Sequence, residues 1–268
     1  MHRVDLHTHS AYSDGTSAPA EVVRLAKGRG VEIFALTDHD SVSGLHEAGE
    51  EANRLGLRFL RGVEINTREE DNLLVLGYGI DPKAAGFEAA LADLRCRRHK
   101  RVAAMVEKLR SLKVDIALSD VHAAHKETIG RPHIADALRR KKVVSSRSEA
   151  FHRFLAKGMP AYVEPMGPTV QEAIDLIRAA GGWASLAHPG ALEAEDIERY
   201  AGLGLEGIEV YYPTHTGAVV ERLLDWAWRF DLIATGGSDY HGPKTSREEI
   251  GSVLFPQDVF EKVLRRLS

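Results

Sequence analysis

Short, mainly apolar runs alternate with amphipathic stretches towards both ends of the chain. The runs stand at residues 3–7, 33–37, 58–65, 73–80, 183–187, 207–211 and 232–236. Such runs are typical of strands buried on both faces by helices, as in a parallel sheet. We expect helices at about 17–28, 44–55 and 170–180, the last opened by Thr169 and Glu172 in the spacing of a capping box. Seven strands, most of them followed by a helix, predict a closed α/β barrel.

The alternation stops between residues 82 and 165. A long basic helix is expected at 86–113 and further helices near 132–141 and 147–157, with no convincing strand between them. We therefore expect two parts: a barrel formed by residues 1–81 and 166–268, and a helical insertion, or cap, formed by residues 82–165.

The insertion is also basic. Residues 82–165 contain 18 Lys and Arg against 9 Asp and Glu, a net charge of +9, so the rest of the chain, whose total is −4, carries −13. The basic residues could simply cover solvated helix faces. Alternatively, they could draw an anionic substrate towards a body that holds cations.

The composition limits where the protein works and which metal sites it can form. No apolar run reaches the ~18 residues of a membrane span, and the start of the chain lacks the basic and apolar segments of a secretory signal. We therefore expect a cytoplasmic protein. The single cysteine, Cys96, excludes an internal disulfide and a cysteine-based zinc knuckle, so His and carboxylates would have to hold any metal.

Histidines and carboxylates recur at the carboxyl ends of the expected strands. The motifs are D-L-H-T-H at 5–9, T-D-H-D at 37–40, G-V-E at 62–64, A-H-P-G at 187–190 and G-S-D-Y-H at 237–241. In an α/β barrel these ends meet at one rim, where active sites form. Each motif alone is often a turn or a cap, but five in equivalent places predict one metal centre with the residues His7, His9, His39, Glu64, His188, Asp239 and His241.

The number of candidate ligands bears on the number of ions. Asp14 lies in the turn Y-S-D-G-T, where Asp followed by Gly is common for structural reasons alone. Alternatively, it is a further ligand near the same rim. So many nitrogen and oxygen ligands exceed the four positions of one tetrahedral zinc ion. Two or three ions that share a bridging carboxylate fit the number better.

The same motifs, in this order over nearly the whole chain, resemble the polymerase and histidinol phosphatase family of metallophosphoesterases. The S-D-G-T turn and R-P-H at 131–133 make the chain most similar to its small stand-alone branch. That branch includes 3′,5′-nucleoside bisphosphate phosphatases and 5′–3′ exoribonucleases that act on short RNA. The resemblance implies a distorted seven-stranded barrel with a helical insertion subdomain. It also implies two or three divalent ions, Mn²⁺ foremost, with Zn²⁺ or Fe²⁺ as alternatives.

The resemblance further implies how the ligands are shared. The first ion would be held by His7, His9, Glu64 and Asp239. Glu64 would bridge to a second ion, completed by His133 and His188, although His122 and His125 compete with His133 for that role. Asp14, His39 and His241 would hold a third. Since members that bind three metals often have His at the position of Asp14, the third site is expected to be weaker or to prefer a harder ion such as Mn²⁺.

These residues predict hydrolysis of a phosphate ester by a metal-activated hydroxide. Arg131, two residues before His133, could grip phosphate oxygens with its planar guanidinium or could be a surface residue at a helix start. The other catalytic candidates are Glu64 and Asp239. Asp38 and Asp40, on either side of His39, are expected to orient ligands.

The basic insertion favours a substrate that carries more than one phosphate. Its cations include Arg97, Arg98, Lys100, Arg101 and the run from Arg139 to Lys142. The aromatic residues that could stack a base, or equally belong to the core, are Phe151, Phe154, Tyr162, Tyr211 and Tyr212. We expect hydrolysis of the 3′-phosphate of 3′,5′-nucleoside bisphosphates such as pAp, and of short 5′-phosphorylated oligoribonucleotides, with no membrane and no stable protein partner involved.

Three other functions fit parts of the sequence. A histidinol-phosphate phosphatase would use the same metals and reaction, but its amine-bearing substrate would gain nothing from a basic insertion. A barrel that has lost catalysis could be a nucleic-acid-binding module, although the complete ligand set argues against decay. An amidohydrolase acting on a C–N bond would need a bridging group, a role that Glu64 fills here in place of a carbamylated lysine.

Overall fold

One sheet of eight strands organises the protein. The computed structural model describes residues 1–69, 73–121, 127–243 and 245–267. Along the sheet the strands follow the order β7-β6-β5-β4-β3-β2-β1-β8. Their bounds are β1 (His2–Asp5), β2 (Ile33–Leu36), β3 (Arg58–Asn66), β4 (Leu74–Tyr78), β5 (Trp183–Leu186), β6 (Gly207–Tyr211), β7 (Ile233–Gly236) and β8 (Leu254–Phe255).

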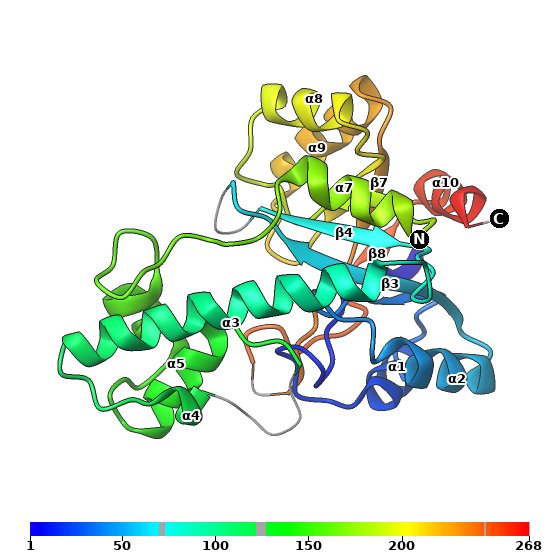
Figure 1. Cartoon of the computed structure of the whole chain (residues 1–268). Helices are drawn as coiled ribbons and strands as arrows, with labels where there is room; N and C mark the ends of the chain where they lie inside the picture. Colours follow the sequence, from blue (N-terminus) through cyan, green and yellow to red (C-terminus); the bar gives the residue numbers. More distant parts are fainter. Residues whose placement is uncertain (70–72, 122–126, 244, 268) are drawn as a thin grey trace.

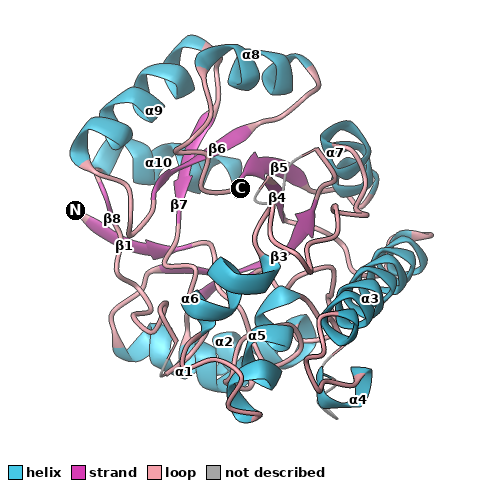
Figure 2. Ribbon diagram, turned by 90° about the vertical axis from the view of Figure 1, so that its left-hand side faces the viewer, coloured by secondary structure: helices cyan, strands magenta, loops and turns pink. Residues whose placement is uncertain are grey.

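The sheet curls until its two sides meet. Just beyond β1, the N–H of Leu6 donates to the carbonyl oxygen of Gly236 in β7 at 3.0 Å. Further on, Thr8 and Tyr240 form an isolated parallel bridge. The strands therefore follow one another around a curve, with the helices outside it (Figure 2).

The α/β class is confirmed, but the strand count of seven is wrong. The eighth strand, β8, runs antiparallel to β1. It has only two residues, which is too few to show an apolar pattern in the sequence. β4 is antiparallel to both β3 and β5, so the sheet is mixed and not parallel throughout. Seven residues separate β3 from β4, whereas a parallel crossover needs about a dozen or more, so β4 has to run back beside β3.

Six helices accompany the strands of the sheet. They are α1 (Pro19–Gly28), α2 (Leu45–Leu55), α7 (Val170–Ala179), α8 (Ala194–Gly202), α9 (Gly217–Arg229) and α10 (Gln257–Arg266). The capping box predicted for α7 is present: the N–H of Thr169 donates to Glu172 Oε2 at 2.7 Å, and the N–H of Glu172 donates to Thr169 Oγ1 at 3.0 Å. Both exchanged bonds satisfy N–H groups that the first helical turn leaves without partners.

The predicted helices of residues 82–165 are also found. They are α3 (Phe87–Ser111), α5 (Arg131–Arg140) and α6 (Arg147–Ala150), with α6 running into the π-helical turn η1 (Phe151–Leu155). A four-residue helix, α4 (Leu118–Val121), adds to them. α3 leaves the sheet and extends away from it, beside α4 and α5 (Figure 1).

Two hydrophobic clusters lie along α3. Its first turns, with Phe87 and Leu91, pack into the core of the sheet. Its second half, with Met105 and Leu109, packs against Leu138 and other residues of α5 in a separate cluster. This separation is what a helical insertion with its own core would show; the domain boundaries at 82 and 165 stay a prediction. Among the described helices, none is long and apolar enough to cross a membrane.

Candidate metal centre

Four of the predicted ligands meet just beyond the ends of β1 and β7 and within β3. His9 Nε2 lies 3.2 Å from Glu64 Oε2 and 3.2 Å from Asp239 Oδ1. His7 Nε2 lies 3.2 Å from Glu64 Oε1 and 3.5 Å from Asp239 Oδ1. All four residues are at most 1% exposed. His7, His9 and Asp239 could hold one metal ion between them.

A second group forms around Asp14. Its Oδ1 lies 3.1 Å from His241 Nε2, and its Oδ2 lies 3.7 Å from His39 Nε2. His9 Nδ1 lies 4.0 Å from the same carboxylate. These four residues are buried and could hold another ion. Asp14 thus lies within the cluster, although its turn by itself favoured a structural role.

The residues predicted for the remaining ion are less closely gathered. His188 Nε2 lies 3.8 Å from Glu64 Oε1, and its ring stacks at 5.8 Å from that of His7. His133 is buried in the first turn of α5, where its Nδ1 accepts from the N–H of Gly130 at 3.0 Å. Its role as a ligand stays a prediction. His122 and His125, its rivals, lie outside the described residues.

Unusual backbone positions place several of these side chains. Three residues have φ values in the left-handed region, which residues other than glycine rarely adopt. The values are 47° for Asp40, 30° for His188 and 53° for Asp239. Gly237 has no room for a side chain, because a Cβ there would collide with the backbone and Cβ of His7. Left-handed backbone of this kind gathers at functional sites, where the surroundings enforce it.

Two buried carboxylates fasten the loops that carry the ligands. Asp38 accepts from the N–H and hydroxyl of Ser10, at 2.8 and 2.6 Å, and from the hydroxyl of Ser13 at 2.5 Å. Asp5 accepts from the N–H and hydroxyl of Ser238, at 2.8 and 2.6 Å. Asp38 therefore holds the turn that leads to Asp14, in keeping with its expected orienting role. Asp5, which the sequence analysis missed, does the same beside Asp239.

A third buried carboxylate, Glu209 in β6, was also missed. It contacts His7 Nδ1 at 3.2 Å and accepts from the N–H of His188 at 2.8 Å. The only signal in the sequence is an acidic residue inside the otherwise apolar strand G-I-E-V-Y. Asp5 stands in the same way within R-V-D-L-H.

The electrostatics of the cluster keep its carboxylates ionised. Burial raises the pKa of Glu64, but the imidazoles of His7 and His39 outweigh it and hold the pKa well below its usual range. Burial lowers the pKa of His9, but the adjacent carboxylates of Asp239 and Glu64 raise it to about 9. Burial also brings the pKa of His39 down to about 3. Without metal, protons on some imidazoles thus balance the acidic charge.

Several buried atoms in the cluster have no hydrogen-bond partner. Among the described residues these include His7 Nε2, His9 Nε2, His39 Nδ1, Asp14 Oδ1 and Glu64 Oε1. A buried polar atom left unsatisfied costs about 1–3 kcal/mol. Divalent cations would satisfy these nitrogen and oxygen atoms, and such donors suit Mn²⁺, Zn²⁺ or Fe²⁺. The donor set therefore fits a metal centre.

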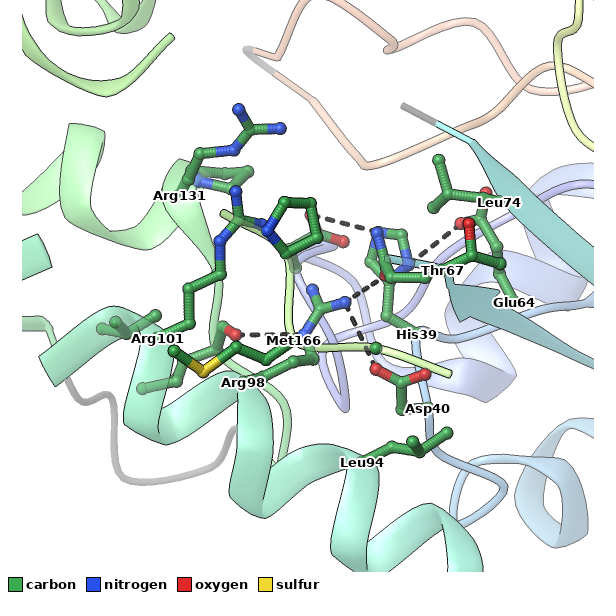
Figure 3. Close-up of a pocket in the computed structure, with 18 of the residues that line it drawn as sticks. His39, Asp40, Glu64, Thr67, Leu74, Leu94, Arg98, Arg101, Arg131 and Met166 are labelled. Atoms are coloured by element: carbon green, nitrogen blue, oxygen red, sulfur yellow. Dashed lines mark hydrogen bonds and ion pairs between the residues drawn. The ribbon is translucent and has the colours of Figure 1, made fainter. Parts of the chain in front are cut away.

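A cavity of about 250 Å³ opens above the cluster. One side is formed by His39, Glu64 and other residues of the cluster; the other side carries Arg101 from α3 and Arg131 from α5 (Figure 3). Apolar side chains complete the lining: Leu74, Leu94, Val102, Met105, Ile129, Phe151 and Met166. The cavity thus combines acidic, cationic and apolar surfaces.

Two arginines reach the acidic side directly. Arg98 Nη1 lies 3.2 Å from Asp40 Oδ2 and also contacts Asn66. Arg247 Nη1 lies 2.8 Å from Asp239 Oδ2, and the hydroxyl of Tyr212 donates to the same oxygen at 2.8 Å. Asp40, which was expected to orient a ligand, thus fastens Arg98. Arg247 was missed because it lies outside the motifs that carry the candidate ligands.

The basic charge of residues 82–165 is divided between the cavity and the outer surface. Arg98 and Arg101 stand three positions apart on one face of α3 and line the cavity. Arg97, by contrast, pairs with Asp93 at 2.6 Å, and Lys141 pairs with Asp120 at 2.9 Å. The basic residues of the insertion thus include some that line the cavity and others that pair with acidic side chains; that the first group draws an anionic substrate stays a prediction.

The aromatic candidates divide in a similar way. Phe151 lines the cavity, where Arg131 Cζ lies 5.4 Å from its ring centroid. Tyr162 is buried, and Phe154 packs against the second hydrophobic cluster. Tyr211 packs on Phe255 at 4.9 Å, in the core of the sheet.

Several known proteins are similar to this chain in sequence over almost its full length. The 3′,5′-nucleoside bisphosphate phosphatase of Chromobacterium violaceum is 33% identical over 260 residues, 94% of this chain and 91% of that protein. The 5′-3′ exoribonuclease of Haemophilus influenzae is 33% identical over 248 residues, 90% of each. The phosphoribosyl 1,2-cyclic phosphate 1,2-diphosphodiesterase of Eggerthella lenta is 32% identical over 250 residues, 89% of this chain and 94% of that protein.

The fold is shared as well. A crystal structure of a suspected metal-dependent phosphoesterase from Bifidobacterium adolescentis has a TM-score of 0.87 and 34% identity, covering 98% of this chain and 95% of that one. The family model described as the PHP domain matches residues 5–162. The resemblance stated from the motifs is thereby confirmed: this protein belongs to the PHP domain family and is a metal-dependent phosphoesterase.

Proposed function

We propose that this phosphoesterase hydrolyses the 3′-phosphate of 3′,5′-nucleoside bisphosphates and also acts on short 5′-phosphorylated oligoribonucleotides. The observation that carries the proposal is the cavity with a buried acidic and imidazole cluster on one side and arginines on the other. The relatives named a bisphosphate phosphatase and an exoribonuclease support it.

The cluster would hold two or three divalent ions, with Mn²⁺ as the first choice. We assign His7, His9, Glu64 and Asp239 to the first ion, and Asp14, His39 and His241 to another. Glu64 would also serve an ion near His188, with His133 as the proposed further ligand. Bound divalent ions lower the pKa of water and neutralise charge on phosphoryl oxygens.

The residues of the chain position the substrate against this cluster. Glu64 and Asp239 lie at the floor of the cavity, and both are held ionised, so they keep cations in place. Arg131 would grip oxygens of the phosphate, because a guanidinium offers a planar pair of donors. Arg247 lies beside Asp239 and adds positive charge at the same end.

A second phosphate explains the additional arginines. Arg98 and Arg101 line the same cavity from α3, in addition to the cluster, where bound ions would neutralise the phosphate that is hydrolysed. Side chains such as Val102, Met105 and Phe151 offer an apolar surface for the nucleoside between the two phosphates. A mononucleotide would leave part of this surface unused.

The test is phosphate release from a panel of substrates by the Mn²⁺-loaded protein. The panel contains pAp, AMP, short 5′-phosphorylated RNA, histidinol phosphate and a ribosyl 1,2-cyclic phosphate, and Glu64→Gln is the inactive control. We expect kcat/KM to be highest for pAp. Equal rates for pAp and AMP would contradict the role of the second phosphate.

Histidinol phosphate remains the alternative substrate, since it requires the same ions and the same bond cleavage. Its amine, however, would face a cavity lined by Arg98, Arg101 and Arg131, and like charges repel. Preferential release of phosphate from histidinol phosphate in the same panel would favour that alternative.

A further inference from the structure

Glu209 joins two of the segments that carry the proposed ligands. It lies in β6, between β5, which leads to His188, and β7, which leads to Asp239. Its side chain is 0% exposed. Its Oε1 and Oε2 lie 3.2 and 3.3 Å from His7 Nδ1, and its Oε2 accepts from the N–H of His188 at 2.8 Å.

The contact with His7 favours a proton on the ring nitrogen that faces Glu209. An ionised carboxylate can only accept hydrogen bonds, so the partner nitrogen, Nδ1, has to donate. A metal ion bound beside Glu64 and Asp239 would leave this imidazole neutral, with its proton on Nδ1 and its lone pair on the other nitrogen. That nitrogen, Nε2, faces Glu64 at 3.2 Å and Asp239 at 3.5 Å and has no hydrogen-bond partner among the described residues.

The contact with His188 involves its backbone N–H and so restrains the backbone at that residue. His188 has a backbone φ of 30°, a positive value that residues other than glycine rarely adopt. The hydrogen bond from its N–H to Glu209 helps to hold this conformation, in which the ring stacks at 5.8 Å from that of His7.

We propose that Glu209 is a positioning residue of the metal centre. It keeps His7 in the form with a proton on Nδ1 and a lone pair on Nε2, and it fastens the loop of His188. This inference rests on the proposed metal-binding role of His7, but it does not depend on the identity of the substrate.

Glu209→Gln should disturb this arrangement without changing the size of the side chain. An amide has one accepting oxygen, and the N–H of His188 can only donate, so the oxygen faces His188. The amide NH₂ then takes the place of Oε1, 3.2 Å from His7 Nδ1, where a donor favours acceptance by Nδ1 and a proton on Nε2. That proton occupies the position where His7 would bind a metal ion.

The experiment measures Mn²⁺ affinity by calorimetry, without substrate, for the wild type, Glu209→Gln and Thr235→Val. Thr235 is the matched control, because it is also buried, in the neighbouring β7. Its hydroxyl forms a hydrogen bond of 2.9 Å with that of Ser185, which is not a proposed metal ligand. We expect Glu209→Gln to weaken Mn²⁺ binding about 10- to 100-fold while its Tm in EDTA stays close to that of Thr235→Val. Wild-type affinity in Glu209→Gln, or a loss that merely follows a fall in the Tm of the metal-free protein, would overturn the proposal.

A second measurement needs no variant. Long-range ¹H–¹⁵N spectra of the Zn²⁺-loaded wild type report which nitrogen of His7 carries its proton. We expect the proton on Nδ1 and the metal on Nε2, and the reverse would reject the proposal even if Glu209→Gln failed to fold. Failure of pAp as a substrate would leave both measurements unaffected, so the two proposals fail separately.

Discussion

His39 and Glu64 are paired through both backbone and side chain. The two residues form an isolated parallel bridge, and His39 Nδ1 lies 3.0 Å from Glu64 Oε2. β2 ends at Leu36, so this bridge continues the alignment of β2 and β3 beyond the strand itself. The backbone pairing that extends the curled sheet thus also sets the distance between two side chains of the cluster.

Glu64→Gln should abolish metal retention and catalysis together. The amide removes one negative charge from a site that relies on ionised carboxylates, and only its oxygen can bind a cation. We expect phosphate release to fall by about 100-fold or more, with less Mn²⁺ per chain in elemental analysis. Glu50→Gln, the same change at an exposed residue, is the control; normal activity in Glu64→Gln would contradict the assignment.

Metal removal should destabilise the protein. Ions that bind only the folded state at 100 times their Kd stabilise it by about 2.7 kcal/mol per site. For a chain of this size each kcal/mol corresponds to roughly 2–4 °C in Tm. We therefore expect EDTA to lower Tm by roughly 5–10 °C for each ion that it removes and Mn²⁺ to restore it. An unchanged Tm in a thermal scan would mean that the cluster binds no ion under those conditions.

Arg131→Ala should raise KM for pAp by about 10-fold or more, because it removes a charged contact with phosphate. The accompanying fall in kcat should be smaller. The measurement is steady-state phosphate release with pAp. Arg139→Ala is the matched control: Arg139 lies on the same helix, but it is half exposed and its Nη2 lies 3.7 Å from Asp136 Oδ1. Equal effects of the two variants would show that overall charge, and not contact by Arg131, attracts the substrate.

Thr169→Ala should cost about 1 kcal/mol of unfolding free energy, because it removes the acceptor for the N–H of Glu172 at the start of α7. Thr216→Ala is the comparison at the start of α9, where the corresponding bond to the N–H of Val219 is longer, at 3.4 Å. Denaturant titration in EDTA should show the larger loss for Thr169→Ala. Equal losses would mean that the reciprocal bond of the capping box contributes little.

The pair of Asp136 and Arg147 should make stability depend on pH. Two hydrogen bonds of 2.8 and 2.5 Å join their side chains. Burial raises the pKa of Asp136, but the bonds to Arg147 outweigh it and lower the pKa. A lowered pKa in the folded state stabilises the protein above the pKa of the unfolded state, and this contribution is lost as pH falls through the folded value.

Asp136→Asn should therefore be less stable than the wild type at neutral pH. The difference in unfolding free energy should shrink below about pH 4, where the unfolded carboxyl takes up its proton. Denaturant titrations in EDTA at several pH values measure it. Asp115→Asn, at a fully exposed carboxylate 3.8 Å from Lys141, should show almost no difference at any pH.

Local pattern determined most of the secondary structure and the members of the cluster. Apolar runs located seven of the strands to within a few residues, and the T-x-x-E spacing located the cap of α7, because burial on both faces and capping depend on neighbours in sequence. His7, His9, His39, Glu64 and the late D-Y-H were recognisable because few other residue types bind cations at strand ends.

Only the tertiary structure decided the direction of β4, the closing contact between Leu6 and Gly236, and the short β8. It also decided that Arg98 and Arg101 face the cavity while Arg97 does not, and that Glu209 stands behind His7. The reason is physical: a strand's partner, a side chain's direction and a buried carboxylate's hydrogen bonds depend on residues distant in sequence, which a local pattern does not contain.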